Sequence, residues 1–234
     1  MTSAPTAEPA HRGSTIRECP APMGSLRARV RRVAAVALPA ALIVGVIAGW
    51  ESGWKYRFVP KKFGVVVPGK IYRSGQISKG LIEGVLVRNK IGLVVDLNGL
   101  DPDDENQRAE IETARRLNVP LKRFPLAGSG LGDIRRYAAA LTSVHKANRE
   151  GKAVLLHCHA GAKRSGVAVG FYRLLVQGRS QDEVVAEMQR YGAQPERGAK
   201  FIVYMNANMR VMAEMLVERG VIPEMPETIP QIVL

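Results

Sequence analysis

One cysteine, one arginine and one serine lie close together in the segment V-L-L-H-C-H-A-G-A-K-R-S-G at residues 154–166. The apolar residues before Cys158 predict a buried strand, and the residues after Arg164 predict a helix. Backbone N–H groups of a loop that closes onto a helix N-terminus favour an anion, and the helix dipole adds to this effect. Such surroundings lower a thiol pKa from about 8.5 to as low as ~3.5–7.5. The sequence therefore predicts that Cys158 is a thiolate at neutral pH.

Arg164 follows Cys158 by six positions. A guanidinium group is planar and donates two parallel hydrogen bonds, which match two oxygens of a phosphate group. A nucleophile beside a phosphate-binding loop predicts a reaction centre for phosphate esters. In the alternative interpretation, Cys158 is a buried structural thiol and Arg164 is only a cation at the start of a helix.

The segment resembles the signature loop of the cysteine-based protein tyrosine phosphatases, His-Cys-x5-Arg-Ser/Thr. The matching positions are His157, Cys158, Arg164 and Ser165, and Gly161 stands at the central glycine of the family. Residues 157–165 are called the signature loop below.

Two further stretches extend this resemblance to about residues 63–215. The stretch F-G-V-V-V-P-G-K-I-Y-R-S-G-Q at residues 63–76 is similar to the opening of membrane-anchored bacterial members of the dual-specificity-like group. The stretch V-V-D-L-N-G at residues 94–99 resembles their second strand, with Asn98 where an arginine is usual.

The resemblance implies a mechanism without a metal or another cofactor. Cys158 would attack phosphorus and form a cysteinyl-phosphate, while Ser165 would stabilise the departing thiolate. His157 would orient the loop rather than transfer a proton. The residues that would bind the phosphate oxygens are His159, Ala160, Gly161, Ala162, Lys163 and Arg164.

The family usually takes its general acid from an aspartate on the loop that precedes the helix before the signature strand. Here that loop is L-A-G-S-G-L-G-D, and its only carboxylate is Asp133, 25 residues before Cys158. This separation is shorter than the usual one, and Asp133 is equally well explained as a helix cap. The carboxylates at residues 101–104 are weaker candidates, because turns and caps explain them.

The leading function is a phosphomonoester hydrolase of the protein tyrosine or dual-specificity type. Lys163 and His159 could favour a highly anionic substrate, such as a phosphoinositide, a phospholipid or an inositol phosphate. Alternatively, these cations merely raise the affinity for any anion. A third interpretation is a phosphate-binding module without catalysis.

Alternating strand and helix patterns predict an α/β fold with a central, mostly parallel sheet of about four to five strands flanked by helices. The expected strands are residues 65–67, 71–73, 93–97, 121–126 and 153–157. The expected helices are residues 78–89, 105–117, 133–148, 165–177, 180–191 and 200–219.

The chain has 234 residues, 46% apolar and 24% charged, which excludes a mostly disordered chain, and two cysteines exclude a disulfide scaffold. Its net charge is +13, and residues 1–62 carry ten basic and three acidic side chains. More than half of the excess therefore lies in the first quarter of the chain. A nucleic-acid reader more often clusters its charge on a folded element, so no nucleic-acid partner is expected.

Residues 33–50 carry no ionisable side chain. At 1.5 Å per residue they span about 27 Å, close to the thickness of a hydrocarbon core. We expect one N-terminal transmembrane helix; a cleaved signal peptide or a buried soluble helix are the alternatives. Six basic residues before it and four after favour a cytoplasmic N-terminus and an extracytoplasmic catalytic domain.

The expected domains follow from these patterns. A disordered basic segment at 1–32 precedes the span at 33–50 and a juxtamembrane linker at 51–62. The phosphatase-like domain at 63–219 is followed by a C-terminal tail at 220–234.

Overall fold

The computed structural model describes residues 42–49, 53–193 and 200–233. Residues 42–49 form a helix, and a separate compact unit runs from Gly53 to Leu234. The expected membrane span at 33–50 lies outside the described residues except for that short helix. Among the helices that the structure describes, none combines the length and apolar character needed to cross a bilayer.

A five-stranded sheet forms the centre of the compact unit. Its order is β1-β2-β5-β3-β4; β1 and β2 are antiparallel, and all other neighbours are parallel. The expected α/β fold with a mostly parallel sheet is therefore confirmed. The strands are β1 (Gly64–Val67), β2 (Ile71–Ser74), β3 (Ile91–Asp96), β4 (Leu121–Arg123) and β5 (Ala153–His157).

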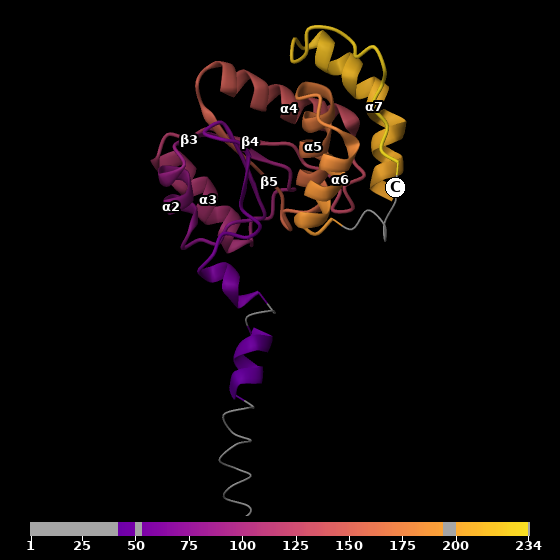
Figure 1. The fold of residues 1–234 in the computed structure, drawn as a ribbon. Coiled ribbons are helices and arrows are strands. Elements are labelled where there is room, and N and C mark those ends of the chain that lie inside the picture. Colours follow the sequence, from indigo (N-terminus) through magenta and orange to yellow (C-terminus); the bar gives the residue numbers. More distant parts are fainter. Residues whose placement is uncertain (1–41, 50–52, 194–199, 234) are drawn as a thin grey trace, which may run out of the picture. The chain divides into compact units, whose positions relative to one another are not determined.

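Helices cover both faces of this sheet. Figure 1 shows α2 and α3 on one side and α5, α6 and α7 on the other. The helical elements of the compact unit are η1 (Trp54–Arg57), α2 (Ile82–Arg88), α3 (Glu105–Arg116), α4 (Ile134–Arg149), α5 (Lys163–Phe171), the π-helical turn η2 (Tyr172–Val176), α6 (Gln181–Arg190) and α7 (Lys200–Glu218).

Strand β5 is buried on both faces, and its residues before His157 are all apolar, as expected for a central parallel strand. Val154 and Leu156 belong to the hydrophobic cluster that includes residues of α4, α5, α6 and α7. Ala153 and Leu155 belong to the smaller cluster on the opposite face, together with residues of α2. Packing on both sides thus holds β5 rigidly at the centre of the sheet.

Several element boundaries differ from the expected ones. Helix α2 begins at Ile82 and has no side-chain cap, so Ser78 does not start it. Instead, the carbonyl of Ser78 accepts hydrogen bonds from Leu81 and Ile82 in a preceding turn. Strand β4 ends at Arg123, before the expected residue 126, although the N–H of Phe124 still donates to the carbonyl of Asp96 at 2.7 Å. Helix α5 begins at Lys163, within the signature loop.

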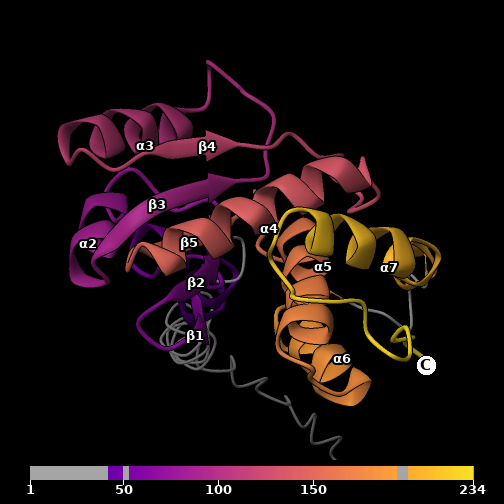
Figure 2. The ribbon, with the colours of Figure 1, turned by 90° about the horizontal axis from the view of Figure 1, so that it is seen from above.

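Parallel strands bring their carboxyl ends to one edge of the sheet. Figure 2 shows β3 and β4 side by side and pointing the same way. In the register of β3 and β5, Asp96 lies opposite His157. The segments that follow β3, β4 and β5 therefore meet at this edge, and Cys158 is the first residue after β5.

Candidate active site

The thiol of Cys158 lies inside the turn of the signature loop. The residue is 1% exposed. The N–H of Gly161 donates to its Sγ at 3.2 Å, and the Oγ of Ser165 lies 3.4 Å from the same sulfur. The loop thus surrounds the sulfur with hydrogen-bond donors, as an anionic thiolate requires.

These contacts shift the pKa of the thiol. Burial alone raises the pKa of Cys158. The hydrogen bonds with Ser165, the positive charge of Arg164 and the N–H of Gly161 act in the opposite direction and prevail. The pKa of Cys158 therefore lies below its ordinary value of 9.0.

Arg164 is held at the sheet edge by two backbone carbonyls. Its Nη1 donates to the carbonyl of Leu97 at 3.1 Å and to that of Leu126 at 3.4 Å. These residues follow β3 and β4, so the guanidinium joins the signature loop to both neighbouring segments. No described residue accepts a hydrogen bond from Nε or Nη2, which leaves these donors for a ligand.

The other residues expected to bind phosphate line the same loop. His159 and Ala160 are exposed, whereas Gly161 and Ala162 are buried beneath them. Lys163 is exposed and is the first residue of α5. The structure therefore gathers all of the expected loop residues around Cys158, at the N-terminus of a helix.

Strand β2 and the residues after it hold the backbone of the loop in place through hydrogen bonds. The guanidinium of Arg73 is fully buried, and its Nη2 donates to the carbonyl of Gly161 at 3.3 Å. The N–H of Gln76 donates to the carbonyl of His159 at 3.1 Å. Sequence reasoning missed these roles, because no local pattern links the Y-R-S-G-Q stretch to the loop.

Gly161 has a left-handed backbone conformation, with φ at 68°. A Cβ at this position would lie 2.5 Å from the backbone nitrogen of Gly75. Both the conformation and the close approach require glycine, which accounts for the central glycine of the signature.

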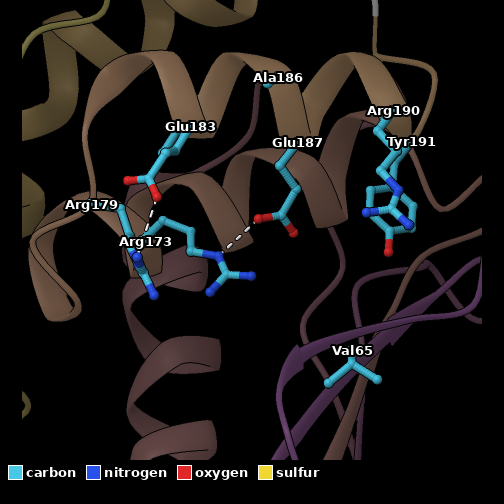
Figure 3. A pocket seen from close by; sticks show the side chains of 9 residues that line it. Val65, Arg173, Arg179, Glu183, Ala186, Glu187, Arg190 and Tyr191 are labelled. Carbon is cyan, nitrogen blue, oxygen red and sulfur yellow. Dashed lines mark hydrogen bonds and ion pairs between the residues drawn. The ribbon is translucent and has the colours of Figure 1, made fainter.

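A pocket of about 440 Å³ between η2, α6 and β1 contains none of residues 157–165 (Figure 3). It bears on the site through Glu187, which accepts from the Nε of Arg173 at 2.8 Å and from the Nη1 of Arg73 at 3.2 Å. The ring of Tyr191 lies 3.9 Å from the guanidinium carbon of Arg73. Glu187 and Tyr191 thus fix the side chain of Arg73, which in turn holds the signature loop.

His157 is buried among carboxylates. Its Nε2 lies 3.1 Å from Oε1 of Glu110 and 3.7 Å from Oδ1 of Asp96. Burial lowers the pKa of His157, but Glu110 and Asp96 outweigh it and raise the pKa to about 9. Sequence reasoning missed both carboxylates, although Asp96 interrupts an apolar run and Glu110 lies on the buried side of α3.

No family model matches the sequence, and no curated protein does. Solved structures match it at low identity. Siw14 from S. cerevisiae, a PP-IP phosphatase whose core catalytic domain was solved with citrate, is 20% identical with a TM-score of 0.57; the match covers 71% of this chain and 98% of that one. TpbA from P. aeruginosa is 20% identical with a TM-score of 0.54, covering 68% and 91%.

A putative phosphatase from Shewanella putrefaciens is 16% identical with a TM-score of 0.50, covering 70% of this chain and 97% of that one. This chain has the fold of the cysteine-dependent tyrosine phosphatases. At such identities the likeness establishes the fold, so the chemistry rests on the residues of this chain.

In this phosphatase fold, Asp133 lies where a helix cap is expected. Its Oδ1 accepts a hydrogen bond from the N–H of Arg135 at 2.9 Å at the start of α4, which confirms the capping interpretation. No described residue donates to its Oδ2, and the side chain is exposed. Asp104 likewise caps α3, and Asp101 accepts from the N–H of Asp103 in a turn.

A second pocket, of about 580 Å³, adjoins the signature loop of this phosphatase fold. Its lining includes His159 of that loop, Gln76 after β2, and the cations Arg57, Lys61 and Lys79. Of these cations, Lys79 is already paired with Glu105 at 2.6 Å. The pocket therefore extends the loop into a basic surface.

Proposed function

We propose that the chain is a phosphomonoester hydrolase of the tyrosine or dual-specificity type. The observation that carries this proposal is the hydrogen-bonded sulfur of Cys158, 3.2 Å from the N–H of Gly161 inside the turn of a loop that ends at Arg164. A structural thiol needs no such donors. A nucleophilic thiolate requires them, because they stabilise its negative charge.

The first chemical step is a transfer of the phosphoryl group to sulfur. A lone pair of the Cys158 thiolate forms the S–P bond while the bond between phosphorus and the ester oxygen breaks. The guanidinium of Arg164 and the N–H groups of residues 159–164 hold the equatorial phosphate oxygens, where negative charge accumulates.

The departing ester oxygen takes a proton and leaves as an alcohol or phenol. Asp133 is the candidate donor, because it lies on the loop that precedes α4 and its Oδ2 has no partner among the described residues. In that role it would both cap α4 and protonate the leaving group.

The second step releases phosphate. A water oxygen forms a bond to phosphorus while one of its protons passes to the Asp133 carboxylate, which gave up its proton in the first step. The S–P bond breaks, and its electron pair returns to sulfur as a thiolate. The hydroxyl of Ser165, 3.4 Å from the sulfur, stabilises that returning charge. His157 orients the loop from the end of β5.

The decisive experiment compares the wild-type chain with Cys158→Ser on an aryl phosphate, with Cys19→Ser as the matched control. We expect Cys158→Ser to abolish turnover and Cys19→Ser to retain it. Rapid quenching of the wild type should trap one phosphoryl group on the peptide that contains Cys158. Near-normal turnover by Cys158→Ser would disprove the covalent mechanism, and tight phosphate binding without a phosphoryl adduct would favour the non-catalytic module.

A highly anionic phosphomonoester is the second candidate substrate, and the basic pocket beside His159 favours it. Lys61 lines this pocket, and Lys163 lies exposed at the start of α5. We propose that a second anionic group of the substrate contacts these amines. The inositol and lipid phosphates belong to this class.

Charge-removing variants test this substrate class. Lys61→Met and Lys163→Met should raise the KM for a substrate with several phosphates about tenfold, with little change for a simple aryl phosphate. Lys146→Met, an exposed change on α4, is the control. Equal KM changes for both substrates would indicate only a general effect on anion affinity.

We also propose that residues 33–50 anchor the chain in a membrane, with the catalytic domain outside the cytoplasm. The apolar run and the excess of basic residues before it support this proposal. Sedimentation of the full-length chain with membranes after an alkaline wash tests the anchor, and protease added to intact cells tests the side. A shortened N-terminus on the mature protein would instead indicate a cleaved signal peptide.

A further inference from the structure

Four ionisable side chains, three of them buried, lie next to the nucleophile, and none of them makes or breaks a bond in the proposed steps. The group consists of Asp96 from β3, Glu110 from α3, Arg123 from β4 and His157 from β5. Asp96 and Glu110 are fully buried, and His157 is 1% exposed. Residues from four separate elements converge here, and His157 is covalently joined to Cys158.

Three close contacts link this group, and one of them joins Asp96 to His157 at 3.7 Å. The Nε of Arg123 donates to Oδ2 of Asp96 at 2.8 Å, which compensates that carboxylate. The remaining carboxylate, Glu110, makes no hydrogen bond through either oxygen within the described residues. The nearest positive group available to it is the imidazole of His157, 3.1 Å away.

With both carboxylates ionised, the charges balance only when His157 is protonated. With a neutral imidazole, the group would hold two carboxylates and one guanidinium, and an uncompensated charge in a buried site is strongly unfavourable. With an imidazolium, the group is neutral. The ligand atoms of Asp96, Glu110 and His157 lie within 4.8 Å of one another, a spacing at which they could also hold a metal ion. Arg123, however, already supplies the positive charge that a metal ion would bring to Asp96.

We infer that Glu110 is a positioning residue that, together with Asp96, holds His157 as an imidazolium beside Cys158 and thereby favours the thiolate. Three groups set the charge of His157: Glu110 from α3, Asp96 from β3, and Cys158 next to it in the chain. Arg123 pairs with Asp96. This inference concerns the free protein, although its use in catalysis rests on the proposed function.

The first test measures the rate at which iodoacetamide alkylates Cys158 as a function of pH, by mass spectrometry of its peptide. In Glu110→Gln we expect the midpoint to rise by about one pH unit, a roughly tenfold lower rate on the acid side. Glu110→Asp should restore part of this loss. Cys19, in the same samples, is an internal reference whose profile stays unchanged.

Glu112→Gln is the matched control, because Glu112 is an exposed carboxylate on the same helix. Its Cys158 profile should coincide with that of the wild type. A Glu110→Gln profile that also coincides with the wild type, in a protein that unfolds cooperatively, would overturn the inference.

The second test measures the wild-type protein itself, and a variant serves only for the assignment. The imidazole signals of the wild-type chain are followed by NMR across neutral pH, and that of His157 is assigned with His157→Asn. We expect His157 to stay charged through neutral pH and to titrate near 9. Titration of His157 near its ordinary value of 6.5 would overturn the inference whatever the variants do.

These readouts also separate this inference from the proposed function. A shifted thiol profile without phosphatase activity would leave the inference standing and refute the function. Hydrolysis that depends on Cys158, with an unshifted thiol profile in Glu110→Gln, would support the proposed function and refute the inference.

Discussion

The guanidinium of Arg73 donates to the carbonyl of Gly161, and the N–H of Gly161 donates to the sulfur of Cys158. A single residue of the signature loop is thus held through its carbonyl from β2 while its N–H faces the nucleophile. Arg73 is itself fixed by Glu187 of α6. The position of one donor to the sulfur therefore depends on residues 88 positions apart in the chain.

Replacing Arg73 by Met should reduce both stability and activity. The change leaves the carbonyl of Gly161 without its donor and Glu187 without one of its partners, so we expect the free energy of unfolding to fall by roughly 3 kcal/mol. Urea denaturation measures this loss, and kcat on an aryl phosphate should fall as well. Arg173→Met is the control, because Arg173 also binds Glu187 but does not reach Gly161; an equal effect on kcat would argue against a role for the loop contact.

Gly161→Ala should prevent the loop from closing. Its Cβ would lie 2.5 Å from the nitrogen of Gly75, and the φ of 68° adds strain. Gly178→Ala separates the two causes, since Gly178 has a φ of 60° but no atom within 4 Å of the added Cβ. We expect about 1–2 kcal/mol from Gly178→Ala and a clearly larger loss from Gly161→Ala, both measured by urea denaturation. Equal losses would show that the close approach is unimportant.

Ser165→Ala should raise the pKa of Cys158 and slow the second chemical step more than the first. Without the hydroxyl 3.4 Å from the sulfur, the returning thiolate loses a hydrogen bond. Rapid-mixing kinetics on an aryl phosphate should then show a burst of phenol followed by slower turnover. Ser180→Ala, which removes the cap of α6, is a control for general destabilisation. Loss of the burst together with turnover would contradict this assignment.

Variants of Asp133 separate its two roles. Asp133→Ala removes the cap of α4 and should cost about 1 kcal/mol of stability, whereas Asp133→Asn retains a capping oxygen. If Asp133 also protonates the leaving group, Asp133→Asn should slow alkyl phosphates at least tenfold and aryl phosphates less, because alkoxides are the poorer leaving groups. Asp104→Asn is the control at the cap of α3. An unchanged kcat on alkyl phosphates would show that Asp133 serves only as the cap of α4.

His157 makes stability depend on pH on the alkaline side. Its pKa in the folded protein is about 9, above the ordinary value of 6.5. A raised pKa means that the folded state binds the proton more tightly, so this stabilisation is complete below pH 6.5 and is lost as the pH rises through about 9. The difference in unfolding free energy between the wild type and His157→Asn should shrink across this window. A constant difference would contradict the raised pKa.

The local parts of the site could be predicted from the sequence. The boundaries of β5 and the cap at Asp133 depend on neighbouring residues alone, and the structure confirms both. The contacts of Arg73 and Glu110 could not be predicted, because they join elements that are distant in the chain. The expected helix at residues 78–89 begins only at Ile82, because the chain first forms a turn at Ser78.

Asn98 illustrates the same limit. It stands where the resemblance places an arginine, and the sequence does not say what replaces that side chain. In the structure, its Nδ2 donates to Oε1 of Gln76 at 3.2 Å, so it supports the segment that in turn supports His159.

The close approach of Gly75 and Gly161 also bears on protein engineering. Residues 73–76 and 157–165 fit together so tightly that neither can be exchanged separately. Grafting the nine-residue loop alone onto another scaffold would leave its central peptide unsupported, and random mutagenesis of either segment would yield mostly inactive clones. Libraries aimed at new substrates should therefore vary the exposed rim at Arg57, Lys79 and Lys163, and keep both glycines fixed.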